Sequence, residues 1–102
     1  MALRIAIQDE SGVLIKSIDD ERNLLVRLTA NSSLERQPFL ASIDPYGDTI
    51  FNRLQIEPFL RELEILSATA QTAEERGLLN AIRELAQESL RDVHQYLVLI
   101  GD

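Results

Sequence analysis

The chain has 102 residues, of which 45% are hydrophobic and 26% charged, a composition typical of one globular domain. Ten basic residues against seventeen acidic ones give a formal net charge of −7, and the basic residues do not cluster, so nucleic acid and anionic membranes are unfavourable partners. Cysteine is absent, which excludes disulfides, thiolate metal sites and cysteine nucleophiles.

No apolar run approaches the roughly 18 residues that a membrane-spanning helix needs, and no long apolar segment follows the N-terminus as in a signal peptide. At this length, folding buries roughly 60 to 70% of the surface of the extended chain, which is enough for one core. We therefore expect a single cytoplasmic domain that comprises residues 1–102.

The N-terminal part of the chain has the two-residue alternation of β-strands. Leu3–Ile7 and Val13–Ile18 alternate around the polar turn Asp9–Gly12, which predicts a first hairpin. The segment Leu24–Leu28 predicts a third strand, and a short helix that begins at Asp20 is the alternative.

A second hairpin is predicted in the middle of the chain, after a polar loop at Asn31–Gln37. Its expected strands are Phe39–Ile43 and Thr49–Asn52, on either side of the turn Asp44–Asp48. We expect Gly47 to adopt the positive φ that returns the chain into the second strand.

After Asn52 the hydrophobic period changes from two residues to 3.6, which predicts two helices. The first extends from Ile56 to about Ala68, with Pro58 in its first turn. The sequence Thr72–Glu75 has the form of a capping box and predicts the start of the second helix. The expected apolar stripe of the second helix is Leu78, Ile82, Leu85, Ala86, Ser89 and Val93.

The C-terminal segment Tyr96–Asp102 fits either a continuation of the second helix or a final strand. We favour a strand, because five successive apolar or aromatic residues suit a strand that is buried on both faces. The sum is an α+β fold, in which two helices cover one face of an antiparallel sheet of four to five strands.

Few residues have a pattern that indicates catalysis. Asp44 and Asp48 flank the predicted turn and offer oxygen ligands for a calcium or magnesium ion, although local bonds to the turn backbone are the simpler interpretation. His94 is the only histidine, which excludes a site with two histidine ligands and leaves a single general base. No nucleophile elbow or phosphate-binding loop is present, and we expect no cofactor.

Two runs of acidic residues, Asp9–Glu10 and Asp19–Glu21, lie in predicted turns. Paired carboxylates can divide acid and base roles when burial separates their pKa values. Adjacent acidic residues in a polar turn are more often solvated, and this is our expectation for both runs.

An acidic stripe on the second helix is a candidate protein-binding surface. Glu84, Glu88 and Asp92 follow one another at four-residue spacing, and like charges at that spacing repel by a few tenths of a kcal/mol per pair. A basic partner would relieve this repulsion, whereas a solvated helix face is the simpler interpretation.

A second binding candidate lies where the predicted hairpin meets the first helix. Arg53 is expected to form an ion pair with Asp44 or Asp48 that fixes the hairpin. The alternative is a site for a small-molecule or peptide carboxylate at Arg53, with Tyr46 as its lid.

Two segments carry a resemblance to small bacterial proteins of unassigned function: DPYGDTIFNRLQ at Asp44–Gln55 and HQYLVLIGD at His94–Asp102. The resemblance implies a compact, single-domain bacterial protein and no particular activity. Some small acidic α+β proteins of this kind are immunity proteins that block a secreted toxin.

Three hypotheses follow for function. The first, which we favour, is a non-enzymatic acidic module that binds a more basic protein, with immunity to a toxin as its most specific form. The second is a small metal-dependent or hydrolytic enzyme that uses Asp44, Asp48 and His94. The third is a structural subunit that self-associates as a homodimer through a free sheet edge or an apolar helix face.

Overall fold

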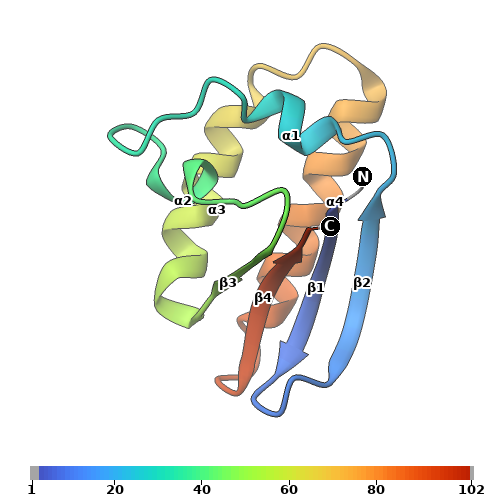
Figure 1. Ribbon diagram of the computed structural model, residues 1–102, viewed down its shortest axis with the longest axis vertical. Coiled ribbons are helices and arrows are strands. Elements are labelled where there is room, and N and C mark those ends of the chain that lie inside the picture. Colours follow the sequence, from blue (N-terminus) through green and yellow to red (C-terminus); the bar gives the residue numbers. More distant parts are fainter. Residues whose placement is uncertain (1–2, 102) are drawn as a thin grey trace.

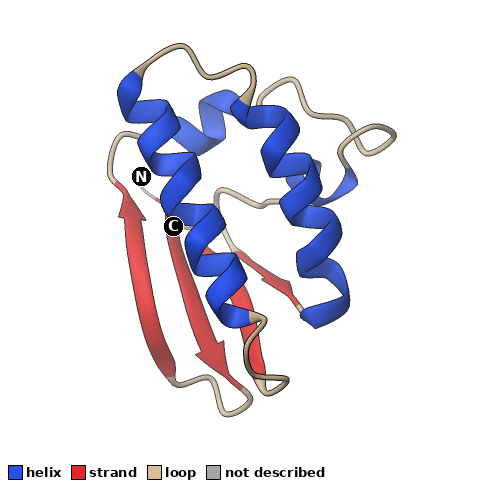
Figure 2. Cartoon of the chain, turned by 180° about the vertical axis from the view of Figure 1, so that it is seen from behind, coloured by secondary structure: helices blue, strands red, loops and turns tan. Residues whose placement is uncertain are grey.

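The computed structural model describes residues 3–101, in which a four-stranded antiparallel sheet of order β2-β1-β4-β3 carries two long helices on one face (Figure 1). The long helices α3 and α4 lie in front of the sheet when it is seen from behind (Figure 2). This arrangement confirms the predicted α+β class. The elements in chain order are β1 (Leu3–Asp9), β2 (Leu14–Asp20), α1 (Leu24–Leu28), α2 (Pro38–Ala41), β3 (Asp48–Phe51), α3 (Arg53–Ser67), α4 (Ala73–Ser89) and β4 (Gln95–Ile100).

The predicted N-terminal hairpin is confirmed. Strands β1 and β2 pair antiparallel, with a bulge after Ile7. In the turn, the Asp9 carboxylate accepts hydrogen bonds from the Ser11 and Val13 amides, both at 2.9 Å, and Gly12 has a φ of 81°. Hydrogen bonds to an aspartate side chain and a glycine with positive φ are both common in turns.

The prediction of a third strand at Leu24–Leu28 is wrong, because this segment is helix α1. The Asp20 carboxylate accepts hydrogen bonds from the amides of Leu24 at 2.9 Å and Leu25 at 2.8 Å, which satisfies two of the free donors of the first helical turn. The helical alternative is correct in type, although the helix begins at Leu24 rather than at Asp20.

The predicted central hairpin is also wrong. Most of its expected first strand lies in helix α2, and β3 pairs with β4 instead. Pro38 explains the helix, because its fixed φ suits the first helical position and it has no amide to donate to a sheet. Gly47 does not have the expected positive φ, and a Cβ there would lie 2.7 Å from Oδ2 of the Asp44 side chain, which would have to shift.

Both predicted long helices are present, with capping boxes at their N-termini. Helix α3 begins at Arg53 rather than at Ile56, so that Pro58 lies inside the helix and not in its first turn. Helix α4 begins after Thr72 as predicted. Its buried residues are Leu79, Ile82, Leu85, Ala86 and Ser89, whereas Leu78 is half-buried and Val93 lies beyond the helix and is exposed.

The C-terminal strand is confirmed as β4, and it occupies the centre of the sheet between β1 and β3. Leu97 and Leu99 belong to the core between the sheet and the helices, which also contains Phe51 and Phe59 with ring centroids 5.0 Å apart. Burying one side chain of this size contributes roughly 1.5–3 kcal/mol relative to leaving it exposed. None of the helices described is both long and apolar enough to cross a membrane.

The turn after α2 packs against the end of β4. The Gly101 amide donates a hydrogen bond of 2.8 Å to the Gly47 carbonyl oxygen, and a Cβ on Gly101 would overlap the Pro45 carbonyl group. The two segments that carry the resemblance are therefore neighbours in space, apart from Asp102, which lies outside the described residues.

We predict that Gly101→Ala destabilises the protein by about 1–3 kcal/mol, because the added methyl group must displace the backbone at Pro45. Gly77→Ala is the matched control, since nothing lies within 4 Å of a Cβ there and alanine stabilises a helix interior by about 0.5–1 kcal/mol. Urea unfolding of the two variants measures both effects. Equal stability of the two variants would show that the turn does not need this close approach.

We also predict an acid-dependent contribution from the α4 capping box. The amides of Gln71 and Thr72 donate to the Glu75 carboxylate and lower its pKa. A lowered folded-state pKa contributes stability above the unfolded pKa, and this contribution is lost as the pH falls through the folded pKa. The melting temperature of wild type should therefore exceed that of Glu75→Gln near neutral pH and approach it below about pH 4.

Candidate functional site

The three residues of the enzymatic hypothesis do not form one site. Asp48 pairs with Ile100 at one end of β4, beside Asp44, whereas His94 precedes the other end of this strand. A strand rises about 3.3 Å per residue, which separates His94 from Asp48 by roughly 20 Å. Within residues 3–101, no three histidine, aspartate or glutamate side chains are close enough to hold a metal ion.

Asp44 and His94 each make other contacts instead. The Asp44 carboxylate accepts a hydrogen bond of 2.9 Å from the Tyr46 amide, as expected for an aspartate that begins a turn. Nδ1 of His94 lies 2.9 Å from the Glu10 carboxylate and connects the loop before β4 to the β1–β2 turn. The histidine is exposed and lies beyond the end of α4.

The acidic runs are not uniformly solvated. Asp20 is only 2% exposed, which corrects the expectation for that residue, and its carboxylate accepts hydrogen bonds from two amides of α1. Asp19 is exposed and lies 2.9 Å from the Arg4 guanidinium. This hydrogen bond and the charge of Asp19 raise the pKa of Arg4.

The acidic stripe on α4 is shorter than predicted. Glu84 is exposed on the helix, but Glu88 lies 3.1 Å from the Lys16 ammonium group of β2. The helix ends at Ser89, and Asp92 lies in the following turn, where its carboxylate accepts a hydrogen bond from the His94 amide. The stripe therefore does not present three free carboxylates on one helix face.

Arg53 and Tyr46 are exposed at opposite ends of β3. In the described part of the chain, Arg53 makes no ion pair with Asp44 or Asp48. The predicted ion pair is therefore absent, whereas the carboxylate site at Arg53 with Tyr46 as its lid stays a prediction.

The structure reveals a different candidate, the sheet face opposite the helices, which we call the open-sheet surface. Ala6 and Val98 are buried but lie outside the core between the sheet and the helices, so they belong to the face turned away from α3 and α4 (Figures 1 and 2). Cross-strand pairing places Val98 between Ala6 and Ile50, and Tyr96 beside Gln8, on this face. The open-sheet surface consists of Arg4, Ala6, Gln8, Leu14, Ser17, Asp19, Asp48, Ile50, Tyr96, Val98 and Ile100, and Arg4 forms an ion pair with Asp19.

A shallow pocket of about 270 Å³ occupies part of this surface and includes both acidic residues of the adjacent turn. Val98 forms its floor and is only 2% exposed, whereas Ile50 at the sheet edge is 57% exposed. The lining contains two carboxylates and no basic side chain. Its residues are Gln8, Asp9, Glu10, Gly12, Ile50, Tyr96 and Val98.

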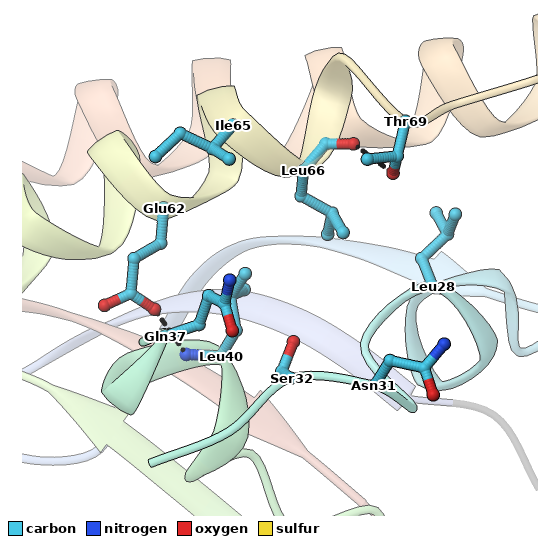
Figure 3. Close-up of a pocket in the computed structure, with 9 residues that line it drawn as sticks. All are labelled: Leu28, Asn31, Ser32, Gln37, Leu40, Glu62, Ile65, Leu66 and Thr69. Carbon is cyan, nitrogen blue, oxygen red and sulfur yellow. Dashed lines mark hydrogen bonds between the residues drawn. The ribbon is translucent and has the colours of Figure 1, made fainter. Parts of the chain in front are cut away.

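A second pocket, of about 240 Å³, lies between α3 and the segment that joins α1 to α2 (Figure 3). Glu62 extends from α3 to α2, where its carboxylate accepts hydrogen bonds from the Phe39 amide at 3.1 Å and the Leu40 amide at 2.9 Å. We call this cavity the Glu62 pocket. It is lined by Leu28, Asn31, Ser32, Gln37, Leu40, Glu62, Ile65, Leu66 and Thr69.

The open-sheet surface and the Glu62 pocket were not predicted from the sequence, although the sequence contains a feature that indicates each of them. Glu62 follows Phe59 at helical spacing on the buried face of α3, where a charged residue is unexpected. The apolar run Tyr96–Ile100 predicted burial on both faces, and Leu97, Val98 and Leu99 are buried although the helices cover one face only.

Comparisons with protein-family models, with curated proteins and with solved structures find no match to this chain.

We predict that the two neighbouring aspartates at the end of β2 differ in their contribution to stability. Asp20→Ala leaves two amides of α1 without their acceptor and should cost about 2 kcal/mol or more. Asp19→Ala removes one exposed ion pair and should cost less than about 1 kcal/mol. Chemical denaturation of both variants tests this, and equal losses would contradict the assignment of Asp20 as the cap of α1.

Proposed function

We propose that this protein is a non-enzymatic binding protein whose open-sheet surface docks a more basic protein. The observation that supports this proposal is the central strand β4, which is apolar on both faces while the helices cover only one. Ala6 and Val98 in the middle of this face are buried, whereas Ile50 is 57% and Leu14 43% exposed on the same face. Exposed apolar side chains on a face that no helix covers are typical of an interaction surface.

The charge of the surface favours a basic partner. Asp9 and Glu10 border the shallow pocket, Asp48 lies next to Ile50 on β3, and the whole chain carries a net charge of −7. Such a field increases the association rate of a basic protein and opposes an acidic one. An apolar side chain of the partner above Val98, with lysine or arginine beside it, would match both features.

The enzymatic hypothesis receives no comparable support, because His94 is separated from Asp44 and Asp48 by the length of β4. Immunity to a secreted toxin is the most specific form of the proposed function. It rests on the acidic charge and on an analogy at the level of the fold.

The experiment is a pull-down from the native cell with wild type and matched variants, followed by calorimetry with the purified partner. Ile50→Glu places a charge on the open-sheet surface, and Leu54→Glu places the same charge on an exposed site of α3. We expect Ile50→Glu to weaken binding by at least about tenfold, since it buries an unpaired charge at the interface, and Leu54→Glu to leave binding unchanged.

Charge reversal in the same assay tests the acidic residues that border the shallow pocket. Glu10→Arg should weaken binding and reduce its dependence on salt, whereas Glu84→Arg on the outer side of α4 should do neither. A partner that binds all four variants equally, or a homodimer in light scattering that Ile50→Glu dissociates, would contradict the proposal.

A further inference from the structure

The Glu62 pocket contains a carboxylate whose negative charge is not paired with a cationic side chain in the described part of the chain. Glu62 is 8% exposed, and its carboxylate accepts hydrogen bonds from only two backbone amides, those of Phe39 and Leu40. A carboxylate offers about four acceptor positions, so some of them are free to accept from another donor. No ion pair involves Glu62 in the described part of the chain, and no lysine, arginine or histidine lines the pocket.

The rest of the lining combines apolar walls with neutral polar groups. Leu28, Leu40 and Leu66 supply the walls, and the side chains of Asn31, Ser32, Gln37 and Thr69 lie around them (Figure 3). An apolar cavity with a few convergent polar groups is the usual form of a small-molecule site. The volume of about 240 Å³ limits the occupant to a small molecule.

We propose that the Glu62 pocket binds a small organic cation, namely an ammonium or guanidinium group on a short apolar chain. The positive group would donate to the Glu62 carboxylate, and its carbon chain would lie against the leucine walls. A hydrogen bond between charged partners is roughly twice as strong as a neutral one, and an apolar surrounding strengthens it further. Anionic ligands are excluded by the same charge.

The competing explanation is that Glu62 has only a structural role, which requires a different property of its side chain. Capping the amides of Phe39 and Leu40 needs an acceptor oxygen, which glutamine also supplies. Binding a cation needs the negative charge, which glutamine lacks. Glu62→Gln therefore separates the two roles.

The experiment is a titration of the protein with n-butylguanidinium chloride, followed by the chemical shifts of backbone amides in NMR spectra. In wild type we expect saturable shifts at Ser32, Phe39 and Leu40, and none with n-butanol, which has the apolar chain without the charge. We expect Glu62→Gln to bind at least about tenfold more weakly, the loss that corresponds to one charge-assisted hydrogen bond. Glu64→Gln, an exposed position on the same helix, should bind as wild type does.

A second variant keeps the test decisive if Glu62→Gln does not fold. Ile65 is exposed at the edge of the pocket, and Ile65→Lys places a permanent ammonium group beside Glu62 that should block the added cation. Saturable binding that survives either variant, equal binding of n-butanol, or the absence of saturable shifts in wild type would overturn the proposal. The open-sheet surface lies on the other face of the sheet, so failure of this proposal leaves the proposed function untouched.

Discussion

The pairing of β4 with two strands that are distant in sequence, β1 and β3, is the constraint on which the rest of the structure depends. This pairing joins strands from the beginning, the middle and the end of the chain into one sheet, and it places Leu97 and Leu99 at the centre of the core. The pairing also brings Gly101 beneath the turn at Pro45, where only a glycine fits. A single residue at the end of the chain thus helps to fix the position of the segment that connects α2 to β3.

Buried carboxylates hold the two short helices in place. Asp20 binds the first amides of α1, and Glu62 binds those of α2. Helices of five and four residues are too short to be stable on their own, so such anchors and tertiary packing determine whether they form. Asp20 and Glu62 are 2% and 8% exposed, and each lies in the wall of a pocket. The pocket at Asp20 includes the basic residue Arg22, whereas the pocket at Glu62 includes no basic residue.

The uneven cover of the sheet is the feature most relevant to function. Both long helices pack on one face, and the other face presents Ile50, Tyr96 and Val98 next to acidic residues of the β1–β2 turn. The candidate residues chosen from the sequence, such as Glu84 and Arg53, lie elsewhere. Charge patterns along one helix predicted a basic partner, but the location of an interaction surface depends on which face of the sheet the helices leave free.

The sequence alone determined the N-terminal hairpin, the long helices with the Thr72–Glu75 capping box, and the final strand, because each depends on side chains within a few residues of one another. The structure decided between the strand and the helix that the sequence allowed at Leu24–Leu28. It alone decided that Pro38–Ala41 is helical, that β3 pairs with β4, and that a pocket forms at Glu62. The physical reason is distance along the chain: the acceptor that organises α2 lies 22 residues after Leu40, and no local pattern can reveal such a bond.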